Sequence, residues 1–221
     1  MAALTWFGHA AFLIDANGLR IMLDPYRTPD VGEYAPIDVP ADIVVVSHLN
    51  PKYHSHWGAA LGNPVHLNSL DFADDPNGAT VKKVQFRAIK VWESPERMVP
   101  VTMPYFTLGG ISFCHSGDLG HGLTPAEAAP IRGVDVFLAV AGGPPTVPLA
   151  ELKAAIDLIQ PRIVIPMHYQ TGKVNLNLSG VEDFLAYFAP EQISRHPAPT
   201  LELSPERLPS PTQVIVLPCA R

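Results

Sequence analysis

The chain has 221 residues, 47% of them hydrophobic and 16% charged, which is enough apolar surface to bury the core of one domain spanning residues 1–221. Its formal net charge is -6 and it has no Lys/Arg run, so nucleic acid is not expected as a partner, because phosphate contacts require clustered positive charge. No apolar stretch is long enough to cross a bilayer and no signal-peptide pattern is present, so we expect a cytoplasmic protein that acts on a small molecule without contacting a membrane. The oligomeric state is left open.

Short apolar segments bounded by Gly, Pro, Asn or Asp dominate the first half of the chain and predict strands. They cover residues 4–8, 11–15, 20–24, 42–47, 80–92, 104–108 and 111–116. Asn17-Gly18 and Gly109-Gly110 separate neighbouring segments and predict tight hairpins.

Helix signals gather in the second half of the chain. Residues 123–132 contain Thr124 as N-cap, Pro125 at the first helical position and Glu127 at the capping-box position. Two more helices are predicted over 148–161 and 179–190, and continuous apolar runs at 134–143 and 162–170 predict buried strands between the helices. The Pro-rich segment 196–213 is expected to be a surface connection before a last strand at 213–218.

This order of elements suits an α/β sandwich of two sheets flanked by helices. The two cysteines, Cys114 and Cys219, have neither metal-site nor disulfide spacing and are interpreted as free thiols.

Six ordered segments resemble the metallo-β-lactamase fold superfamily, and among its branches the UlaG-like metal-dependent hydrolases. They are TWFGHAAFLID, IMLDPY, DIVVVSH, CHSGDLGH, AVAGG and IPMHYQT, which together span almost the whole chain. The resemblance implies a single-domain αββα sandwich with two mixed β-sheets and a metal site at one edge of the sheets. In that family a metal-activated water attacks a carbonyl or phosphoryl centre.

The family builds its metal site from a His-x-His-x-Asp-His loop, a mid-chain His, a bridging Asp and a late His. The loop here matches only in part. His48 stands at the first His, but Asn50 replaces the second, Lys52 replaces the Asp and Tyr53 replaces the last His. The resemblance therefore implies a degenerate loop.

The remaining ligand positions lie farther along the chain. The mid-chain His falls at Trp92-Glu93, and an indole offers no lone pair to a metal. Asp118 matches the bridging Asp and His168 the late His, so three of seven expected ligands remain: His48, Asp118 and His168.

We therefore expect a small-molecule enzyme with a repurposed, metal-poor site, in which a His acts as base, Asp118 holds a charge partner, and Lys52 with Tyr53 stabilises negative charge on a substrate oxygen. Ester, lactone or amide hydrolysis and proton-transfer chemistry suit these groups equally well. The expected catalytic residues are His48, Lys52, Tyr53, Asp118 and His168, and the expected substrate-contacting residues are His9, Asn50, His54, Trp92 and Glu93.

Two alternatives remain open. In one, His48, Asp118 and His168 hold a single divalent metal ion, Zn, Mn or Fe, with His54 or His56 delivered by a shift of the loop; otherwise no cofactor is expected. In the other, the same cleft belongs to a non-catalytic binding protein or partner subunit.

Three further residues lie beside the matched positions. His115 and His121 flank Asp118 and are expected to hold outer hydrogen bonds. Asp24 matches a family segment near the site, and an ordinary role as a turn former is at least as well supported.

Overall fold

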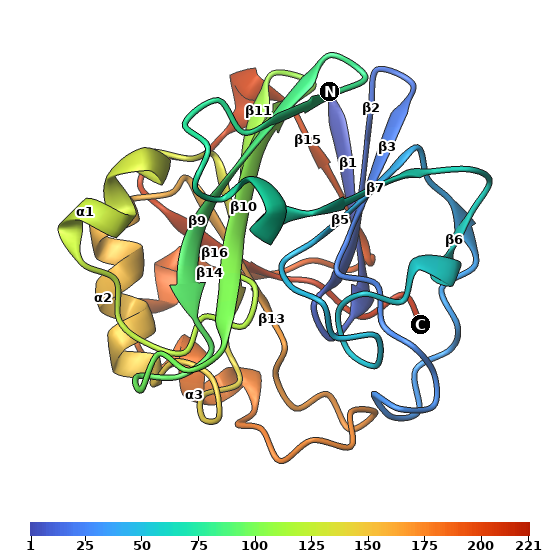
Figure 1. The fold of residues 1–221 in the computed structure, drawn as a ribbon. Helices are drawn as coiled ribbons and strands as arrows, with labels where there is room; N and C mark the ends of the chain where they lie inside the picture. The colour runs from blue at the N-terminus through green and yellow to red at the C-terminus, as the bar shows by residue number, and fades with distance from the viewer.

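The computed structural model describes residues 1–221 and contains two large mixed β-sheets packed face to face (Figure 1). The first sheet has six strands, in the spatial order β15 (Thr200–Leu203), β1 (Ala2–Gly8), β2 (Ala11–Ala16), β3 (Leu19–Leu23), β5 (Ile43–Val46) and β7 (Val65–Asn68). A separate short pair is formed by β4 (Val39–Pro40) and β6 (Ala60–Leu61).

The second sheet has eight strands, which come mostly from the middle and the end of the chain. In spatial order they are β14 (Ile193–Arg195), β16 (Gln213–Val216), β13 (Ile163–Met167), β12 (Val136–Val140), β11 (Ile111–His115), β10 (Pro100–Leu108), β9 (Val84–Trp92) and β8 (Ala79–Val81). The strands β11, β12 and β13 are parallel, and every residue of β12 and β13 is buried, which explains the continuous apolar sequences of these two strands.

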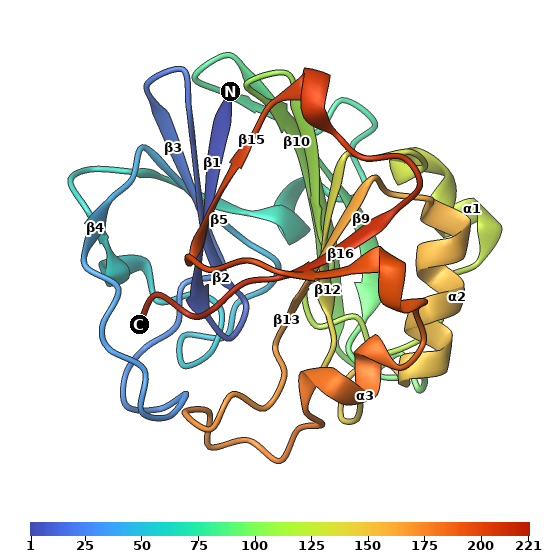
Figure 2. The same cartoon turned by 180° about the vertical axis from the view of Figure 1, so that it is seen from behind.

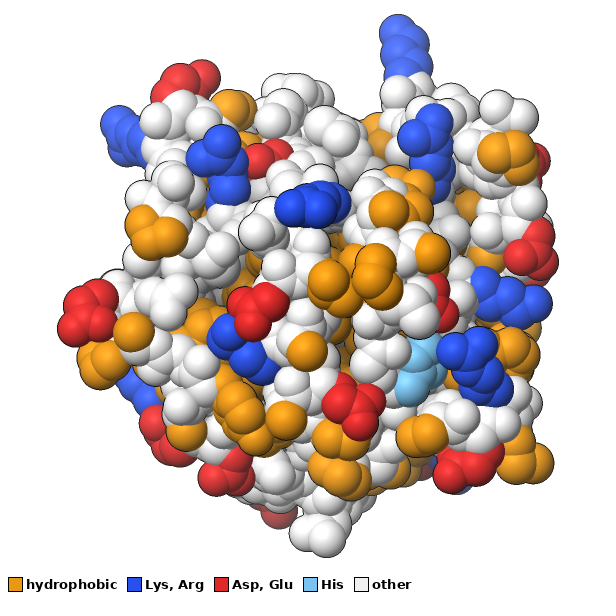
Figure 3. Space-filling view, turned by 90° about the vertical axis from the view of Figure 1, so that its left-hand side faces the viewer, with side chains coloured by type: hydrophobic (Ala, Val, Ile, Leu, Met, Phe, Trp, Pro, Cys, Tyr) orange, Lys and Arg blue, Asp and Glu red, His pale blue; other side chains and the backbone are white.

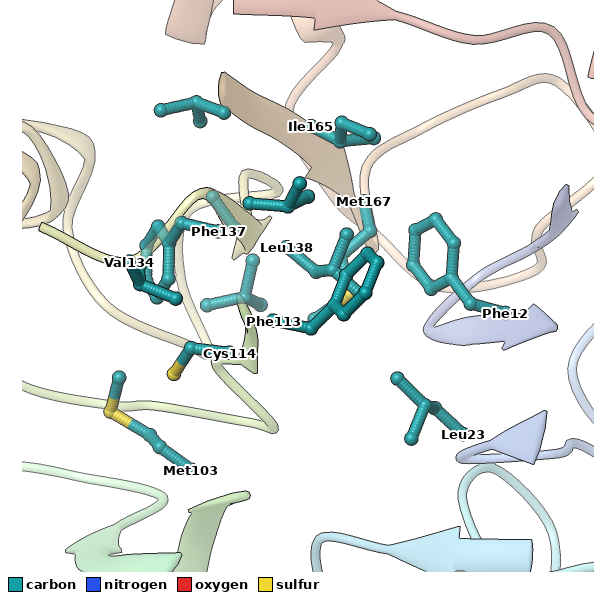
Figure 4. Close-up of a cluster of buried hydrophobic side chains, with 14 of the residues drawn as sticks. Phe12, Leu23, Met103, Phe113, Cys114, Val134, Phe137, Leu138, Ile165 and Met167 are labelled. Carbon is teal, nitrogen blue, oxygen red and sulfur yellow. The ribbon is translucent and has the colours of Figure 1, made fainter. Parts of the chain in front are cut away.

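The main core lies between the two sheets (Figure 4). Phe12 and Leu23 of the first sheet point toward Phe113, Leu138 and Met167 of the second, and all five side chains are buried. This packing fixes the two sheets relative to each other, and with them the loops that leave their ends.

The three α-helices lie on the outer face of the second sheet (Figure 1). They are α1 (Pro125–Ala128), α2 (Leu149–Ile159) and α3 (Val181–Leu185). The capping box of α1 is formed as predicted, with Thr124 and Glu127 each bonding the other's backbone N–H. No helix is both long enough and apolar enough to cross a membrane.

The outer face of the first sheet is covered by loops, so the second helical layer of the expected αββα order is absent there. Buried side chains from residues 26–37 and 59–60, among them Tyr26, Tyr34 and Ile37, form this cover. Pro25, Pro29 and Pro36 punctuate the segment, and because proline cannot donate a backbone hydrogen bond, a helix is not available to it. The fold class itself, two mixed sheets of metallo-β-lactamase type, is as predicted.

Two predictions of single elements were wrong. Residues 80–92 form a hairpin, β8 and β9, because Lys82 and Lys83 adopt positive φ and turn the chain. The Pro-rich segment 196–213 contains β15, which pairs with β1 at the edge of the first sheet (Figure 2). Prolines before and after β15 are tolerated because they lie outside the ladder.

Candidate metal centre

The residues that gather in the site all follow the carboxyl ends of strands. In the first sheet β1, β3 and β5 run parallel to one another, and His9, Asp24 and Ser47 come directly after them. In the second sheet His168 directly follows β13, and Asp118 lies three residues beyond the end of β11. Parallel strands end at a common edge, so residues distant in the sequence converge there.

Asp118 is the centre of this group. The side chain of Asp118 is 8% exposed, and its Oδ2 lies 2.8 Å from Nε2 of His54 and 4.0 Å from Nε2 of His48. The other carboxylate oxygen, Oδ1, lies 3.5 Å from Nε2 of His168. Asp118 therefore faces three buried imidazoles, contributed by both sheets.

The loop after β5 explains why His54 reaches the site. The carbonyl oxygen of Asn50 accepts hydrogen bonds from the backbone N–H groups of residues 53, 54 and 55, so the loop coils into a single turn. This turn buries His54 against Asp118 and leaves Lys52 exposed in solvent. Lys52 therefore makes no ion pair with Asp118, and the imidazole that stands in for the missing last His of the motif is His54, one residue beyond Tyr53.

Asp24 and Ser47 orient the two imidazoles of this loop. The backbone N–H and the hydroxyl of Ser47 donate to Asp24, at 2.7 and 2.6 Å. Because the Ser47 proton is used in this way, Ser47 Oγ accepts from Nδ1 of His48 at 3.0 Å. Nδ1 of His54 donates to Asp24 at 3.0 Å. Both rings thus carry a proton on Nδ1 and direct Nε2 toward Asp118. Outer carboxylate and hydroxyl partners hold metal-binding imidazoles in this way.

His115 and His121 hold the neighbouring loops through hydrogen bonds to backbone groups, and neither bonds a candidate metal ligand directly. His115 Nε2 donates to the carbonyl oxygen of Ala10, and its Nδ1 accepts from the backbone N–H of Gly117, each at 2.9 Å. His121 Nε2 accepts from the backbone N–H of Trp92 at 3.3 Å. These bonds fix the segment that carries Asp118 to β1 on one side and to β9 on the other.

The charges in the cluster follow from burial and from the two carboxylates. Burial lowers the pKa of His48 and His168 below the ordinary histidine value, so both rings are neutral at neutral pH. Burial also opposes the charged form of His54, but Asp118 and Asp24 outweigh it and raise the pKa of His54 to about 10. Burial alone would raise the pKa of Asp118, yet the charge of His54 and its hydrogen bond to the carboxylate hold that pKa well below the usual range.

The donor set fits a divalent transition metal. The ligand atoms of His48, His54 and Asp118 lie within 4.8 Å of one another. His48 Nε2, Asp118 Oδ1 and His168 Nδ1 are buried and have no hydrogen-bond partner. A buried polar atom without a partner is costly, and neutral imidazoles with a carboxylate are the ligands preferred by Zn, Mn and Fe. The site is thus not degenerate, and the expectation of a metal-poor pocket is corrected.

Glu93 lies beside this centre, and its carboxylate makes no hydrogen bond or ion pair. It follows β9, and its backbone is held against the Asp118 loop: the backbone N–H of Gly120 donates to Trp92 at 2.8 Å, and a Cβ at Gly120 would come within 1.8 Å of the Glu93 carbonyl oxygen. Only glycine permits this approach. Burial raises the pKa of Glu93, and the charge of Asp118 raises it further.

The remaining residues that the sequence places in the site, the expected catalytic Tyr53 and three expected substrate contacts, lie at different depths around the centre. His9 is fully buried within it, whereas Tyr53 is half-buried and stacks on the His9 ring, with centroids 5.9 Å apart. Asn50 uses its backbone to shape the loop, and Trp92 binds His121 through its backbone. The sequence interpretation left the orienting role of Ser47 unrecognised, since a serine beside a metal-site histidine carries no signal of its own.

Two mixed sheets with a buried histidine and aspartate cluster at the carboxyl ends of their strands define a protein of the metallo-β-lactamase fold class. A family model described as the beta-lactamase superfamily domain matches residues 3–168, well over half of the chain, and the protein belongs to this superfamily.

Similar proteins support the same assignment. A crystal structure from Thermotoga maritima, of a candidate Zn-dependent hydrolase of the metallo-β-lactamase superfamily, is 32% identical, covers 98% of both chains and has a TM-score of 0.77. A UPF0173 metal-dependent hydrolase of Carboxydothermus hydrogenoformans is 27% identical over 207 residues, covering 77% of this chain and 86% of the relative. A metallo hydrolase from Ignicoccus hospitalis shares the fold, with a TM-score of 0.55 at 22% identity and coverage of 77% and 83%.

Proposed function

We propose that the protein is a metal-dependent hydrolase whose metal ion is held by His48, His54, Asp118 and His168. One observation carries this proposal: a buried carboxylate faces three imidazoles, and several of their lone-pair atoms lack any partner within the protein. The names of the UPF0173 relatives and of the Thermotoga protein support it. We therefore favour the alternative in which a single metal ion is bound over a repurposed, metal-poor site. His54 joins His48, Asp118 and His168 as a proposed ligand.

A divalent metal bound here would supply a Lewis acid and a nucleophilic water at neutral pH. The protein supplies orientation through Asp24 and Ser47, which hold the rings of His54 and His48 with Nε2 directed inward. Glu93 is the group we assign to proton transfer at its carboxyl oxygens. Its raised pKa and its lack of a fixed partner leave it free to take up and release a proton at the edge of the centre.

We further propose a small molecule with an ester, lactone or amide bond as substrate. Acidic and basic side chains are interspersed on the face that carries α1 and α2, with no single-sign patch (Figure 3). Together with the net charge of -6, this supports a small-molecule substrate over a polyanion.

The test measures metal content and activity together. Protein purified without chelator is analysed by elemental mass spectrometry and assayed on a panel of lactones, esters and amides, before and after chelation and reloading with Zn, Mn or Fe. We expect bound metal and chelator-sensitive hydrolysis, both lost in Asp118→Asn and both retained in His66→Ala, an exposed histidine outside the site. Wild-type protein that binds no added metal, or hydrolysis that survives chelation, would contradict the proposal.

A further inference from the structure

We infer that His9 is an additional ligand of the metal centre, forming a three-imidazole face with His54 and His168. The inference rests on the proposed function in requiring a bound metal ion, but it concerns a residue outside the His-x-His-x-Asp-His loop and outside the ligand positions that the resemblance implies.

The geometry places His9 directly against two ligands. One ring nitrogen of each of His9, His54 and His168 lies within 4.8 Å of the others. The His9 ring centroid lies 4.2 Å from that of His168 and 5.0 Å from that of His54. A single ion can therefore be reached by nitrogen atoms from β1, the β5 loop and the end of β13.

The hydrogen bonding of His9 points the same way. Its side chain is 1% exposed, and neither Nδ1 nor Nε2 has a hydrogen-bond partner. A histidine that merely orients a loop uses a ring nitrogen to do so, as His115 does with Ala10 and Gly117. His9 binds nothing through its ring except by aromatic contact, and a buried imidazole without partners is explained by a missing ligand.

The backbone of His9 is built to hold the ring in place. The residue adopts φ +50°, in the left-handed region, at the irregular turn between β1 and β2. Its carbonyl oxygen accepts from the indole N–H of Trp6 at 3.1 Å and from the backbone N–H of His168 at 3.0 Å. Positive φ at a non-glycine residue persists where surrounding contacts over-determine it, and such residues cluster at functional sites.

His9 also accounts for the incomplete loop motif. Asn50 and Lys52 stand where the motif has a His and an Asp, and Lys52 is exposed. The imidazole of His9, from the turn after β1, would supply one of the two ligands that the loop lacks. The centre thus gains a ligand from a part of the chain that no loop motif would reveal.

The test variant is His9→Asn, chosen because asparagine tolerates the left-handed backbone and removes only the imidazole. The matched control is His66→Asn, an exposed histidine on β7. Apoprotein of each form is titrated with Co²⁺ followed by visible absorption and with Zn²⁺ against a competing chelator. Zinc X-ray absorption of the loaded proteins then counts imidazole ligands, and circular dichroism of the apoproteins monitors folding.

We expect His9→Asn to fold as the wild type, to lose one imidazole from the zinc, to alter the Co²⁺ spectrum, and to weaken Zn²⁺ binding by more than the roughly 10- to 100-fold that loss of an outer partner costs. An unchanged imidazole count with wild-type affinity would overturn the role of His9 while leaving the hydrolase proposal intact. If the wild type itself binds no Zn²⁺ or Co²⁺, both proposals fail together. Should His9→Asn not fold, His9→Gly, which adopts the left-handed backbone without a steric penalty, takes its place in the same measurements.

Discussion

At the scale of single residues, the centre depends on imidazoles whose protons are fixed by neighbours. Asp24 and Ser47 each bind the Nδ1 side of a ring, so the Nε2 side remains for a metal. His54 occupies a special position, because without metal it bridges two carboxylates, Asp24 and Asp118. Metal binding must displace the proton on its Nε2, so metal affinity and pH are linked.

The first prediction at this scale concerns the shift of the loop ligand from residue 53 to residue 54. His54→Gln should lower the metal content of the purified protein to near zero, since it removes the imidazole nearest Asp118. Lys52→Ala should retain full metal content, because Lys52 is exposed. Elemental analysis of both variants measures this, with folding checked by circular dichroism. If Lys52→Ala lost its metal and His54→Gln kept it, His54 would not be the loop ligand and the prediction would be wrong.

The second prediction concerns the pH dependence of apoprotein stability. The pKa of His54 rises from 6.5 to about 10 on folding, so its contribution is complete below pH 6.5 and disappears as pH rises toward 10. His9, His48 and His168 have lowered pKa values because of burial, so their neutral forms favour folding above pH 6.5 and this gain disappears as pH falls.

Together these histidines place the maximum stability of the apoprotein close to pH 6.5. Urea unfolding of chelator-treated protein from pH 5 to 10 measures how the free energy of unfolding depends on pH. The metal-loaded protein serves as the comparison, because bound metal removes the proton from His54 and should flatten the alkaline side. Apoprotein stability that keeps increasing to pH 9 would show that His54 does not carry the bridging proton.

At the scale of elements, the site depends on close packing between loops. After β12, Gly142 lies against the carbonyl group of His168, where a Cβ would approach the oxygen to 2.2 Å. The turn at Gly142 also accepts the backbone N–H of Ser179 at 2.8 Å. The loops after β12 and β13 thus share a boundary that only a glycine allows.

We therefore predict that Gly142→Ala lowers the free energy of unfolding by roughly 1–3 kcal/mol and weakens metal binding, because the added methyl group must push His168 aside. Gly180→Ala is the matched control, since a Cβ there meets no atom within 4 Å and the φ of -71° suits alanine, so it should leave metal binding unchanged and change stability by less than about 1 kcal/mol. Chemical unfolding and Zn²⁺ titration of both variants test this. Equal effects in the two variants would show that the contact with His168 is unimportant.

At the scale of the whole molecule, the centre joins the two sheets. His48 and His54 follow the first sheet, whereas Asp118 and His168 follow the second. In the absence of metal, Asp118 and His54 hold these edges together through one ion pair. A bound metal ion would link the same edges directly, so it should stabilise the fold as a whole.

The corresponding prediction is a rise in melting temperature on metal binding. At a free metal concentration about 100-fold above Kd the stabilisation is roughly 2.7 kcal/mol, which for a domain of this size corresponds to about 5–11 °C. Calorimetry with and without chelator measures the rise. Asp118→Asn should show no such response, and a melting temperature that is insensitive to metal in the wild type would mean that the centre does not bridge the sheets.

The fold class, most strands and the hairpins at Asn17-Gly18 and Gly109-Gly110 could be predicted from the sequence, because alternation, buried apolar runs and turn residues act locally. It also identified Asp118, His48 and His168 as neighbours through ordered motifs. That His54 is the loop imidazole nearest to Asp118 could be learned only from the folded chain. That choice depends on how the chain coils around the Asn50 carbonyl oxygen, which no spacing rule describes.

The positions of His9, Asp24 and Ser47 were also decided by tertiary structure. Each follows a different strand, and the three meet because β1, β3 and β5 end at one edge of the first sheet, which the second sheet then covers. Strand order is set by long-range pairing and by packing of the core between the sheets, so the sequence can suggest which residues bind but not which of them share a centre.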